Sequence, residues 1–297
     1  MYDVMILGGG PAGCTAALYG ARAGLSCVVL EGLAGGQVAL TPRVENYPGA
    51  PGMDGQALAA LMRRQAEEAG AEFLRLYAAE VSLTDEVKSA GNVSARTAIL
   101  ATGASPRRLG LAGEEELTGR GISYCAACDG AFFRGRRVAV VGGGNTAVSN
   151  VLYLSKLCSE VHLIHRRGTL RASTVWKEAL CRLDNLHIHW NCETRELIAG
   201  EFLEGVRLEN TADGKVETLP LDGIFVAIGR APETTLFAGM VETDEDGYLL
   251  ADESTRTSLP GVFAAGDVRK KPVRQIVTAV ADGAVAATAA ERYLAER

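Results

Sequence analysis

The sequence lacks a long apolar run, an excess of basic charge and a set of evenly spaced cysteines. No uninterrupted apolar stretch approaches the roughly 20 residues that cross a bilayer. The 36 acidic against 30 basic residues give a net charge of −6 without a basic block, so neither nucleic acids nor anionic membranes are expected partners. The first residues, MYDVMILGGGPAG, show neither the charged nor the apolar region of a signal peptide. We therefore expect a cytoplasmic protein that binds small molecules or another protein.

Seven cysteines are present, and their odd number and irregular spacing argue against a structural disulfide framework. Five of them lie in apolar or helical contexts, where we expect them to be buried as small apolar side chains. These five are Cys14, Cys27, Cys158, Cys181 and Cys192. Only Cys125 and Cys128 stand three positions apart, in the stretch YCAACDG. This pair therefore needs its own explanation.

Such a pair could bind a metal, pack structurally or carry electrons. A zinc site would need two further ligands, and no second Cys-x-x-Cys and no His-x-x-x-His is present. The small alanines between Cys125 and Cys128 permit close approach of the sulfurs, which favours a redox dithiol. Asp129 follows directly, and a carboxyl with a raised pKa could supply the proton that a leaving sulfur needs. An N-cap or turn aspartate before Gly130 is the alternative.

Two βαβ units of one design are predicted. In the first, an apolar strand at residues 4–7 runs into the glycine turn GGGPAG, an alanine-rich helix and a second strand. A dinucleotide site needs such a turn, because backbone must approach the pyrophosphate and a helix N-terminus must hold its charge. Gly8, Gly10 and Gly13 supply that turn, and Glu31 ends the second strand, where a carboxylate accepts from a ribose 2′-hydroxyl. A tight turn without a ligand is the alternative.

The second unit repeats the spacing in GGGNTA, with alanine in place of the third glycine. Counting from the first glycine, the position of Glu31 is taken by a histidine within a basic segment. That segment contributes His165, Arg166, Arg167 and Arg171. Guanidinium groups bind a 2′-phosphate in bidentate fashion, whereas a carboxylate repels it. Unless the segment is only a solvated basic patch, the second site suits NADPH and the first suits FAD.

Strands that end in ATGA and AIGRAP bracket the second unit. The simplest organisation is an α/β protein with two Rossmann-like three-layer nucleotide-binding domains, in which the NADPH domain is inserted into a discontinuous FAD domain. We predict an FAD-binding domain at residues 1–108 and 232–297. The NADPH-binding and redox-disulfide domain is predicted at residues 109–231.

Motifs along nearly the whole chain, in the right order, resemble bacterial low-molecular-weight thioredoxin reductases. They are GGGPAG, GGQVALTPRVENYPG, ATGA, CAACDGAFFRG, GGGNTA, HRRGTLRA, FAAGDV and RQIVTAVADGAVAA. The cysteine motif just before a second glycine turn is specific, because longer disulfide reductases carry their cysteines in the FAD domain. The resemblance implies a homodimeric, NADPH-dependent thioredoxin-disulfide reductase that passes electrons through FAD to a Cys-x-x-Cys disulfide and on to thioredoxin.

The resemblance also implies roles for single residues. Cys125 and Cys128 would form the redox disulfide, with Asp129 as the proton donor. The residues expected at FAD are Gly8, Gly10, Pro11, Ala12, Gly13, Glu31, Gly36, Gln37, Asn46, Asp267, Arg274 and Gln275. Those expected at NADPH are Gly142, Gly144, Asn145, Thr146, His165, Arg166, Arg167 and Arg171. No metal ligand is expected.

The dithiol and the second glycine turn fall in one predicted domain, although both must reach one flavin. The resemblance implies that this domain rotates between two orientations, about the connections near residues 107–112 and 229–234. Cys128 is expected to lie nearer the flavin. The residues that resemble part of a thioredoxin-docking surface are Phe132, Phe133 and Arg134.

Two departures from the family pattern leave alternatives open. After GGGNTAV the family usually has two glutamates, where this chain has Ser149 and Asn150, and the stretch 81–98 is shorter than usual. One alternative is a related flavin disulfide reductase that uses ferredoxin, reduced flavin or NADH, or that serves another dithiol protein. The other is a non-catalytic redox sensor.

Overall fold

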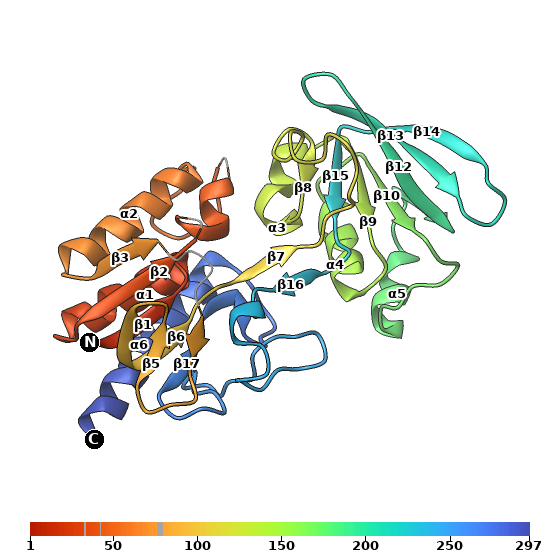
Figure 1. Cartoon of the computed structure of the whole chain (residues 1–297). Coiled ribbons are helices and arrows are strands. Elements are labelled where there is room, and N and C mark those ends of the chain that lie inside the picture. The colour runs from red at the N-terminus through yellow and green to blue at the C-terminus, as the bar shows by residue number, and fades with distance from the viewer. Residues whose placement is uncertain (33, 42, 76–79) are drawn as a thin grey trace. The chain divides into compact units, whose positions relative to one another are not determined.

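The computed structural model describes residues 1–32, 34–41, 43–75 and 80–297, and the chain divides into two compact units (Figure 1). The first unit comprises Met1–Ser105 and Ala231–Arg297, and the second comprises Pro106–Arg230. The boundaries fall within two short strands that pair with each other, β7 (Ala104–Pro106) and β16 (Arg230–Pro232). The second unit is thus an insertion in the sequence of the first.

The first unit is built on a sheet for which seven strands are described. In order of pairing they are β3 (Glu72–Arg75), β2 (Cys27–Glu31), β1 (Tyr2–Leu7), β6 (Val93–Leu100), β5 (Lys88–Ala90) and β4 (Val81–Ser82), with β17 (Val262–Ala264) also on β6. Strands β1, β2, β3, β6 and β17 pair in parallel, and β4 and β5 add an antiparallel edge. The helices are α1 (Pro11–Arg22), α2 (Gly55–Glu68) and α6 (Ile276–Ala295), with short 3-10 turns η1 (Gly36–Leu40), η3 (Thr235–Phe237) and η4 (Gly266–Val268).

Both faces of β1 are covered, which explains why its sequence is continuously apolar rather than alternating. Val4 and Ile6 pack with alanines of α1 and α6. Met5 and Leu7 point to the opposite face, in a core closed by segments around Phe237 and Leu249. This central position places the end of β1, and the glycine turn after it, at the middle of the sheet edge.

The second unit repeats this plan with a five-stranded parallel sheet. Its strands, in order of pairing, are β11 (Leu186–Trp190), β10 (Glu160–His165), β9 (Arg137–Val141), β15 (Gly223–Val226) and β8 (Ile122–Ser123). Three antiparallel strands form a separate sheet: β12 (Cys192–Ala199), β13 (Leu203–Asn210) and β14 (Val216–Pro220). The helical elements are α3 (Ala126–Asp129), η2 (Gly130–Phe133), α4 (Asn145–Leu154) and α5 (Thr174–Leu180).

The two faces of the five-stranded sheet have different covers. Val138 and Val140 of β9 face the core that contains α4 and α5, whereas Ala139 faces the core closed by the three-stranded sheet. The structure thus confirms the predicted α/β class. Within the described part of the chain, no helix is long and apolar enough to cross a bilayer.

One prediction about the isolated cysteines is wrong. Four of the five are buried, but Cys181 is exposed, because it follows the last residue of α5 at the rim of the unit. Burial raises the pKa of the Cys14 and Cys27 thiols to about 12, so both are protonated at neutral pH.

Candidate functional site

Cys125 and Cys128 are joined as a disulfide, with an S–S distance of 2.08 Å and a Cα–Cα distance of 5.3 Å. Cys125 precedes the first residue of the short helix α3, and the helical turn brings Cys128 back beneath it. Both residues are half-buried. The pair is therefore placed and oxidised as a redox disulfide requires, rather than held apart as two packed thiols.

Asp129 ends α3, and its carboxyl is a poor site for a negative charge. Burial raises the pKa of Asp129, and a hydrogen bond from Ser123 lowers it in part. Ser123 Oγ donates to Asp129 Oδ2 at 2.6 Å, whereas Oδ1 has no hydrogen-bond partner among the described residues. Asp129 makes no side-chain cap to the following turn, so the alternative of a capping aspartate is not supported. A buried carboxyl with a raised pKa beside a disulfide can act as a proton donor.

The surface beside the motif differs from the predicted one at a single residue. Phe132 is 43% exposed and Arg134 is exposed. Phe133 instead turns inward and packs edge-on against Phe225 of β15, with ring centroids 5.2 Å apart. Phe133 is therefore partly buried against the core of the unit, whereas Phe132 and Arg134 expose their side chains.

The first glycine turn lies where β1 meets α1. Gly10 is the N-cap of α1 and Pro11 is its first residue, so the helix N-terminus opens on this turn. A Cβ on Gly9 would overlap the carboxylate of Glu31, which shows how closely the end of β2 approaches the turn. Glu31 is 4% exposed; Oε1 pairs with Arg63 Nη1, while Oε2 has no partner among the described residues. This buried oxygen is a ready acceptor for a ligand hydroxyl.

The other residues predicted at FAD come together in the same unit from distant parts of the sequence. A Cβ on Gly36 would lie 3.1 Å from Gly10 Cα. Asn46 Nδ2 donates to Gln275 Oε1 at 2.9 Å, although 229 positions separate them. Arg274 Nε donates to the carbonyl of Asp267 at 3.3 Å. Gly266, which precedes Asp267, lies against Ala12, since its Cβ would be 2.8 Å from that of Ala12. Pro11 and Ala12 open α1, Gly8 and Gly13 frame the turn, and Gln37 is exposed in η1.

The second glycine turn has the same construction. Gly144 is the N-cap of α4, and a Cβ on Gly143 would overlap the ring of His165, just as one on Gly9 would overlap Glu31. The carbonyl of Gly143 accepts from Arg171 N at 2.7 Å and from Ala172 N at 3.1 Å, so the basic segment is fastened to the turn. Asn145 Oδ1 accepts from Ser173 N at 3.0 Å. Gly142 and Thr146 complete the turn, which confirms that His165 occupies the place of Glu31.

The basic segment carries positive charge that no carboxylate neutralises. Arg166, Arg167 and Arg171 are exposed, and none of them forms an ion pair within the described residues. Burial lowers the pKa of His165, and the three arginines lower it further, so His165 is neutral at pH 7. This cluster of free guanidinium groups at a helix N-terminus is suited to a phosphate.

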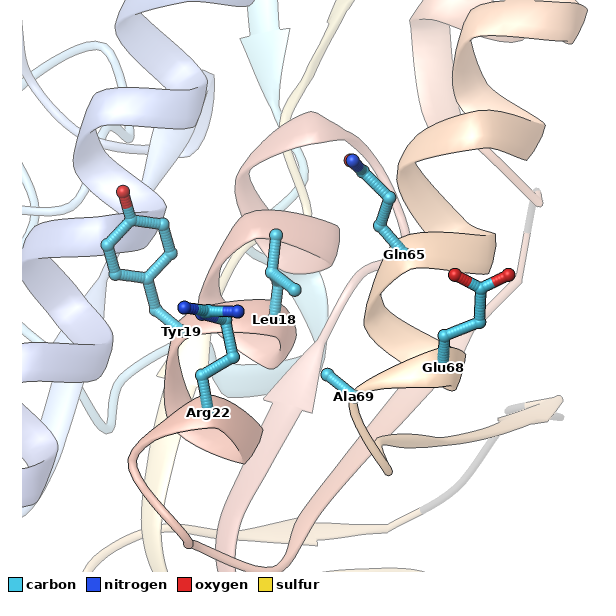
Figure 2. A pocket seen from close by; sticks show the side chains of 6 residues that line it. All are labelled: Leu18, Tyr19, Arg22, Gln65, Glu68 and Ala69. Carbon is cyan, nitrogen blue, oxygen red and sulfur yellow. The ribbon is translucent and has the colours of Figure 1, made fainter.

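Two other features do not qualify as the site. A hollow of about 460 Å³ is lined by Leu18, Tyr19, Arg22, Gln65, Glu68 and Ala69 (Figure 2). It lies at the end of α1 remote from the glycine turn and contains no predicted site residue. His162 Nδ1 and His189 Nε2 face each other at 3.1 Å, yet no group of three or more His, Cys, Asp or Glu among the described residues is arranged to hold a metal.

Comparison with known proteins identifies the family. A family model described as pyridine nucleotide-disulphide oxidoreductase matches residues 2–283. The chain belongs to this family. It is 46% identical to the thioredoxin reductase of Listeria innocua, over 100% of this chain and 95% of the relative, and 44% identical to that of Streptomyces coelicolor, over 99% and 94%. The crystal structure of thioredoxin reductase from Streptococcus pyogenes matches with a TM-score of 0.93 and 40% identity, over 100% of this chain and 99% of that one.

These likenesses confirm the predicted family resemblance and the fold with two Rossmann-like domains. The chain is an oxidoreductase of the pyridine nucleotide-disulphide type. Three residues that support the site were missed by the sequence motifs: Ser123, Arg63 and Asn191. Arg63 and Asn191 contact residues that are distant in the sequence, so no short pattern indicates them, whereas Ser123 contacts Cys125 and Asp129 within its own stretch of the chain.

Asn191 lies at the connection between β11 and β12, and its backbone is hydrogen-bonded to the basic segment. It adopts a left-handed conformation with φ of 55°, and its N–H donates to the carbonyl of Arg167 at 3.4 Å. Its own carbonyl accepts from Thr211 N at 2.6 Å and from Thr211 Oγ1 at 3.0 Å. Such a conformation is tolerated by asparagine and glycine but strained for other residues.

Replacing Asn191 by alanine is expected to destabilise the second unit by about 1 kcal/mol, a decrease of roughly 2–4 °C in melting temperature. Asn191→Gly is the matched control, because glycine adopts a positive φ without strain. Thermal unfolding followed by circular dichroism checks the pair. The assigned strain would be contradicted if the alanine variant had the same melting temperature as the wild type and a higher one than the glycine variant.

Proposed function

We propose that this chain is an NADPH-dependent thioredoxin-disulfide reductase. The observation that carries the proposal is the Cys125–Cys128 disulfide beside the buried acid Asp129, on the unit that also bears the basic glycine turn. In the overall reaction, NADPH and one proton reduce a disulfide to two thiols and leave NADP⁺. Whole-length identity to thioredoxin reductases of 42–46% supports thioredoxin as the disulfide substrate.

The first unit fits FAD. Oε2 of Glu31, which has no partner among the residues that the structure describes, would accept from a ribose hydroxyl, and the N-terminus of α1 behind Gly10 would face the pyrophosphate. Gly36, Asn46, Asp267, Arg274 and Gln275 would line the rest of the site. When bound, FAD supplies the two-electron relay between nicotinamide and disulfide, which no amino-acid side chain can provide.

The second unit fits NADPH. The N-terminus of α4 behind Gly144 would face the pyrophosphate, with Gly142, Asn145 and Thr146 in the same turn. Arg166, Arg167 and Arg171 would hold the 2′-phosphate, and neutral His165 would lie behind them without repelling them.

The reaction of the disulfide depends on residues of this chain. Reduction breaks the S–S bond, and each sulfur becomes a thiol by taking one electron and one proton. Asp129 would give its proton to the sulfur that leaves as a thiolate, since burial keeps the carboxyl protonated to higher pH than usual. In the next exchange Cys125 or Cys128 would attack the thioredoxin disulfide, beside the exposed Phe132 and Arg134.

The dithiol and the basic turn belong to the same unit, Pro106–Arg230, and both must reach one flavin. We therefore keep the prediction that this unit rotates between two orientations, one for each reaction. A homodimer remains a prediction from the family resemblance, and a cytoplasmic location remains a prediction from the sequence. Light scattering after gel filtration would check the dimer.

Anaerobic titration of the flavin-loaded protein tests the function. NADPH is expected to bleach the flavin absorbance with about two electron pairs per chain, one for the flavin and one for the disulfide. Continuous NADPH oxidation is then expected only when a bacterial thioredoxin disulfide is added. Failure of both NADPH and NADH to bleach the flavin would overturn the proposal. Bleaching by NADH alone would favour the alternative donor that Ser149 and Asn150 leave open.

A further inference from the structure

Ser123 connects the two ends of the redox motif. It is the last residue of β8, pairs alongside Phe225 of β15, and is 4% exposed. Its hydroxyl oxygen accepts from the backbone N–H of Cys125 at 3.0 Å and donates to Asp129 Oδ2 at 2.6 Å. One buried hydroxyl thus contacts the residue that precedes α3 and the residue that ends it.

The direction of these hydrogen bonds follows from proton counting. A serine hydroxyl has one proton, and Ser123 has two acceptors within reach: Asp129 Oδ2 at 2.6 Å and the carbonyl of Cys125 at 3.4 Å. The shorter bond, to a carboxyl oxygen, is the stronger one. When Asp129 is ionised, the proton therefore points to Oδ2. It stays there when Asp129 is protonated on Oδ1, whereas protonation on Oδ2 would turn the serine hydroxyl to the longer contact with the carbonyl of Cys125 at 3.4 Å.

A proton on the other carboxyl oxygen leaves the hydrogen bond from Ser123 to Oδ2 in place. Asp129 Oδ1 has no hydrogen-bond partner among the described residues. We propose that Ser123 is a positioning residue, which holds Asp129 Oδ2 so that the transferable proton sits on Oδ1. This inference deepens the proposed function, because it assigns the acid of the disulfide chemistry to one oxygen and names the side chain that orients it.

Few other groups act on Asp129. Burial and the Ser123 bond are the influences found on its pKa, with no charged side chain contributing among the described residues. The neighbouring helix α4 presents Tyr153 and Leu154 to Gly130, and neither contributes to the shift in the pKa of Asp129. Removing the Ser123 hydroxyl would therefore raise the pKa of Asp129, because the bond that stabilises the ionised form is lost.

The chemistry balances without any further reactant in a test that uses dithiothreitol. Its thiolate attacks one sulfur of the Cys125–Cys128 bond, and the other sulfur leaves as a thiolate that takes the proton of Asp129 Oδ1. A second attack, within the dithiothreitol mixed disulfide, releases oxidised dithiothreitol and the reduced pair. The protein gains two electrons and two protons, and dithiothreitol loses them.

A pair of variants of equal shape isolates the hydroxyl. Ser123→Thr keeps it and Ser123→Val replaces it by a methyl group, so strain from the added atoms is the same in both. The rate of disulfide reduction by dithiothreitol is measured by thiol quantification between pH 5 and pH 9. The thiolate fraction of dithiothreitol is common to all variants at each pH, so rate ratios report the protein alone.

Relative to the Thr variant, the Val variant is expected to be about tenfold slower at the acidic end, part of the 10²–10⁴-fold effect of a positioned acid. The difference in reduction rate between the Val and Thr variants should become smaller as pH rises, because Asp129 keeps its proton to higher pH in the Val variant than in the Thr variant. Asp129→Asn should remove the part of the pH dependence of the reduction rate that the protein itself contributes. Ser155→Ala, whose hydroxyl bonds only to Leu152 O in its own helix, is the control and should follow the wild type.

The proposal would be overturned if the Thr and Val variants had the same rate of reduction at every pH, or if the Val variant were slower by a factor that does not change with pH. If the two Ser123 variants do not fold, Ser123→Ala takes the place of the Val variant and Ser155→Ala serves as its reference. The same pH-dependent difference in reduction rate is then expected between them. The assay needs neither nucleotide nor thioredoxin, so a failed NADPH titration with a normal dithiothreitol profile would sink only the proposed function.

Discussion

Replacement of Cys125 or Cys128 by serine is expected to lower NADPH-dependent reduction of thioredoxin by at least about 1000-fold. The two sulfurs form the disulfide that stores the electrons, and a serine hydroxyl can neither form that bond nor leave as a stable anion at neutral pH. Reduction of the flavin by NADPH should persist in both variants, since the basic turn is untouched. Stopped-flow absorbance separates the two half-reactions.

Cys181→Ser is the matched control, because this cysteine is exposed, unpaired and outside the motif. Its turnover should equal that of the wild type. A Cys125→Ser or Cys128→Ser variant that still reduces thioredoxin at more than a few per cent of the wild-type rate would remove the disulfide from the pathway.

The same variants test which sulfur lies nearer the flavin. If Cys128 is the nearer one, the Cys125→Ser protein keeps its thiolate beside the flavin and shows a charge-transfer absorption at long wavelength. The Cys128→Ser protein should lack this absorption. A band found only in the Cys128→Ser protein would reverse the assignment.

Replacing Arg166 and Arg167 together by glutamine is expected to raise the KM for NADPH about 100-fold and to leave the KM for NADH within about twofold. Each guanidinium-phosphate bond contributes roughly 1.5 kcal/mol, and 1.4 kcal/mol corresponds to tenfold in affinity. Both arginines are exposed and outside any ion pair within the described residues, so their removal leaves no carboxylate unpaired. Steady-state kinetics with each nucleotide measures the two KM values.

Arg182→Gln provides the control, as an exposed arginine of the same unit that lies beyond α5 and away from the glycine turn. It should change neither KM. Equal losses with NADPH and NADH in the double variant would show that the arginines act on the shared part of the nucleotide or on the fold. The preference for the 2′-phosphate would then need another origin.

The candidate site divides into parts that local sequence could predict and parts that it could not. Each glycine turn is a local pattern of strand, glycines and helix, so its position followed from a few neighbouring residues. The equivalence of Glu31 and His165 also followed from counting, and the overlap of each with its turn glycine bears this out. The partners of these groups did not follow, because Arg63 reaches Glu31 from another helix.

The errors have the same origin. Cys181 was expected to be buried and is exposed, and Phe133, expected on a docking surface, is partly buried, because the sequence around each gives composition but not the direction of the side chain. Phe133 turns inward since Gly223 leaves room beneath it and Phe225 offers an edge contact. Cys181 is exposed because α5 ends just before it.

The sequence by itself determined the two nucleotide-binding turns, their different charge and the redox pair, since each is encoded within a short stretch whose chemistry is local. Only the tertiary structure decided which side chains complete them. It brought Asn46 to Gln275 across 229 positions and Arg63 of α2 to Glu31, and it left Oε2 of Glu31 buried without a partner among the described residues. Those contacts depend on how separate elements pack against one another, which the neighbours of each residue along the chain do not determine.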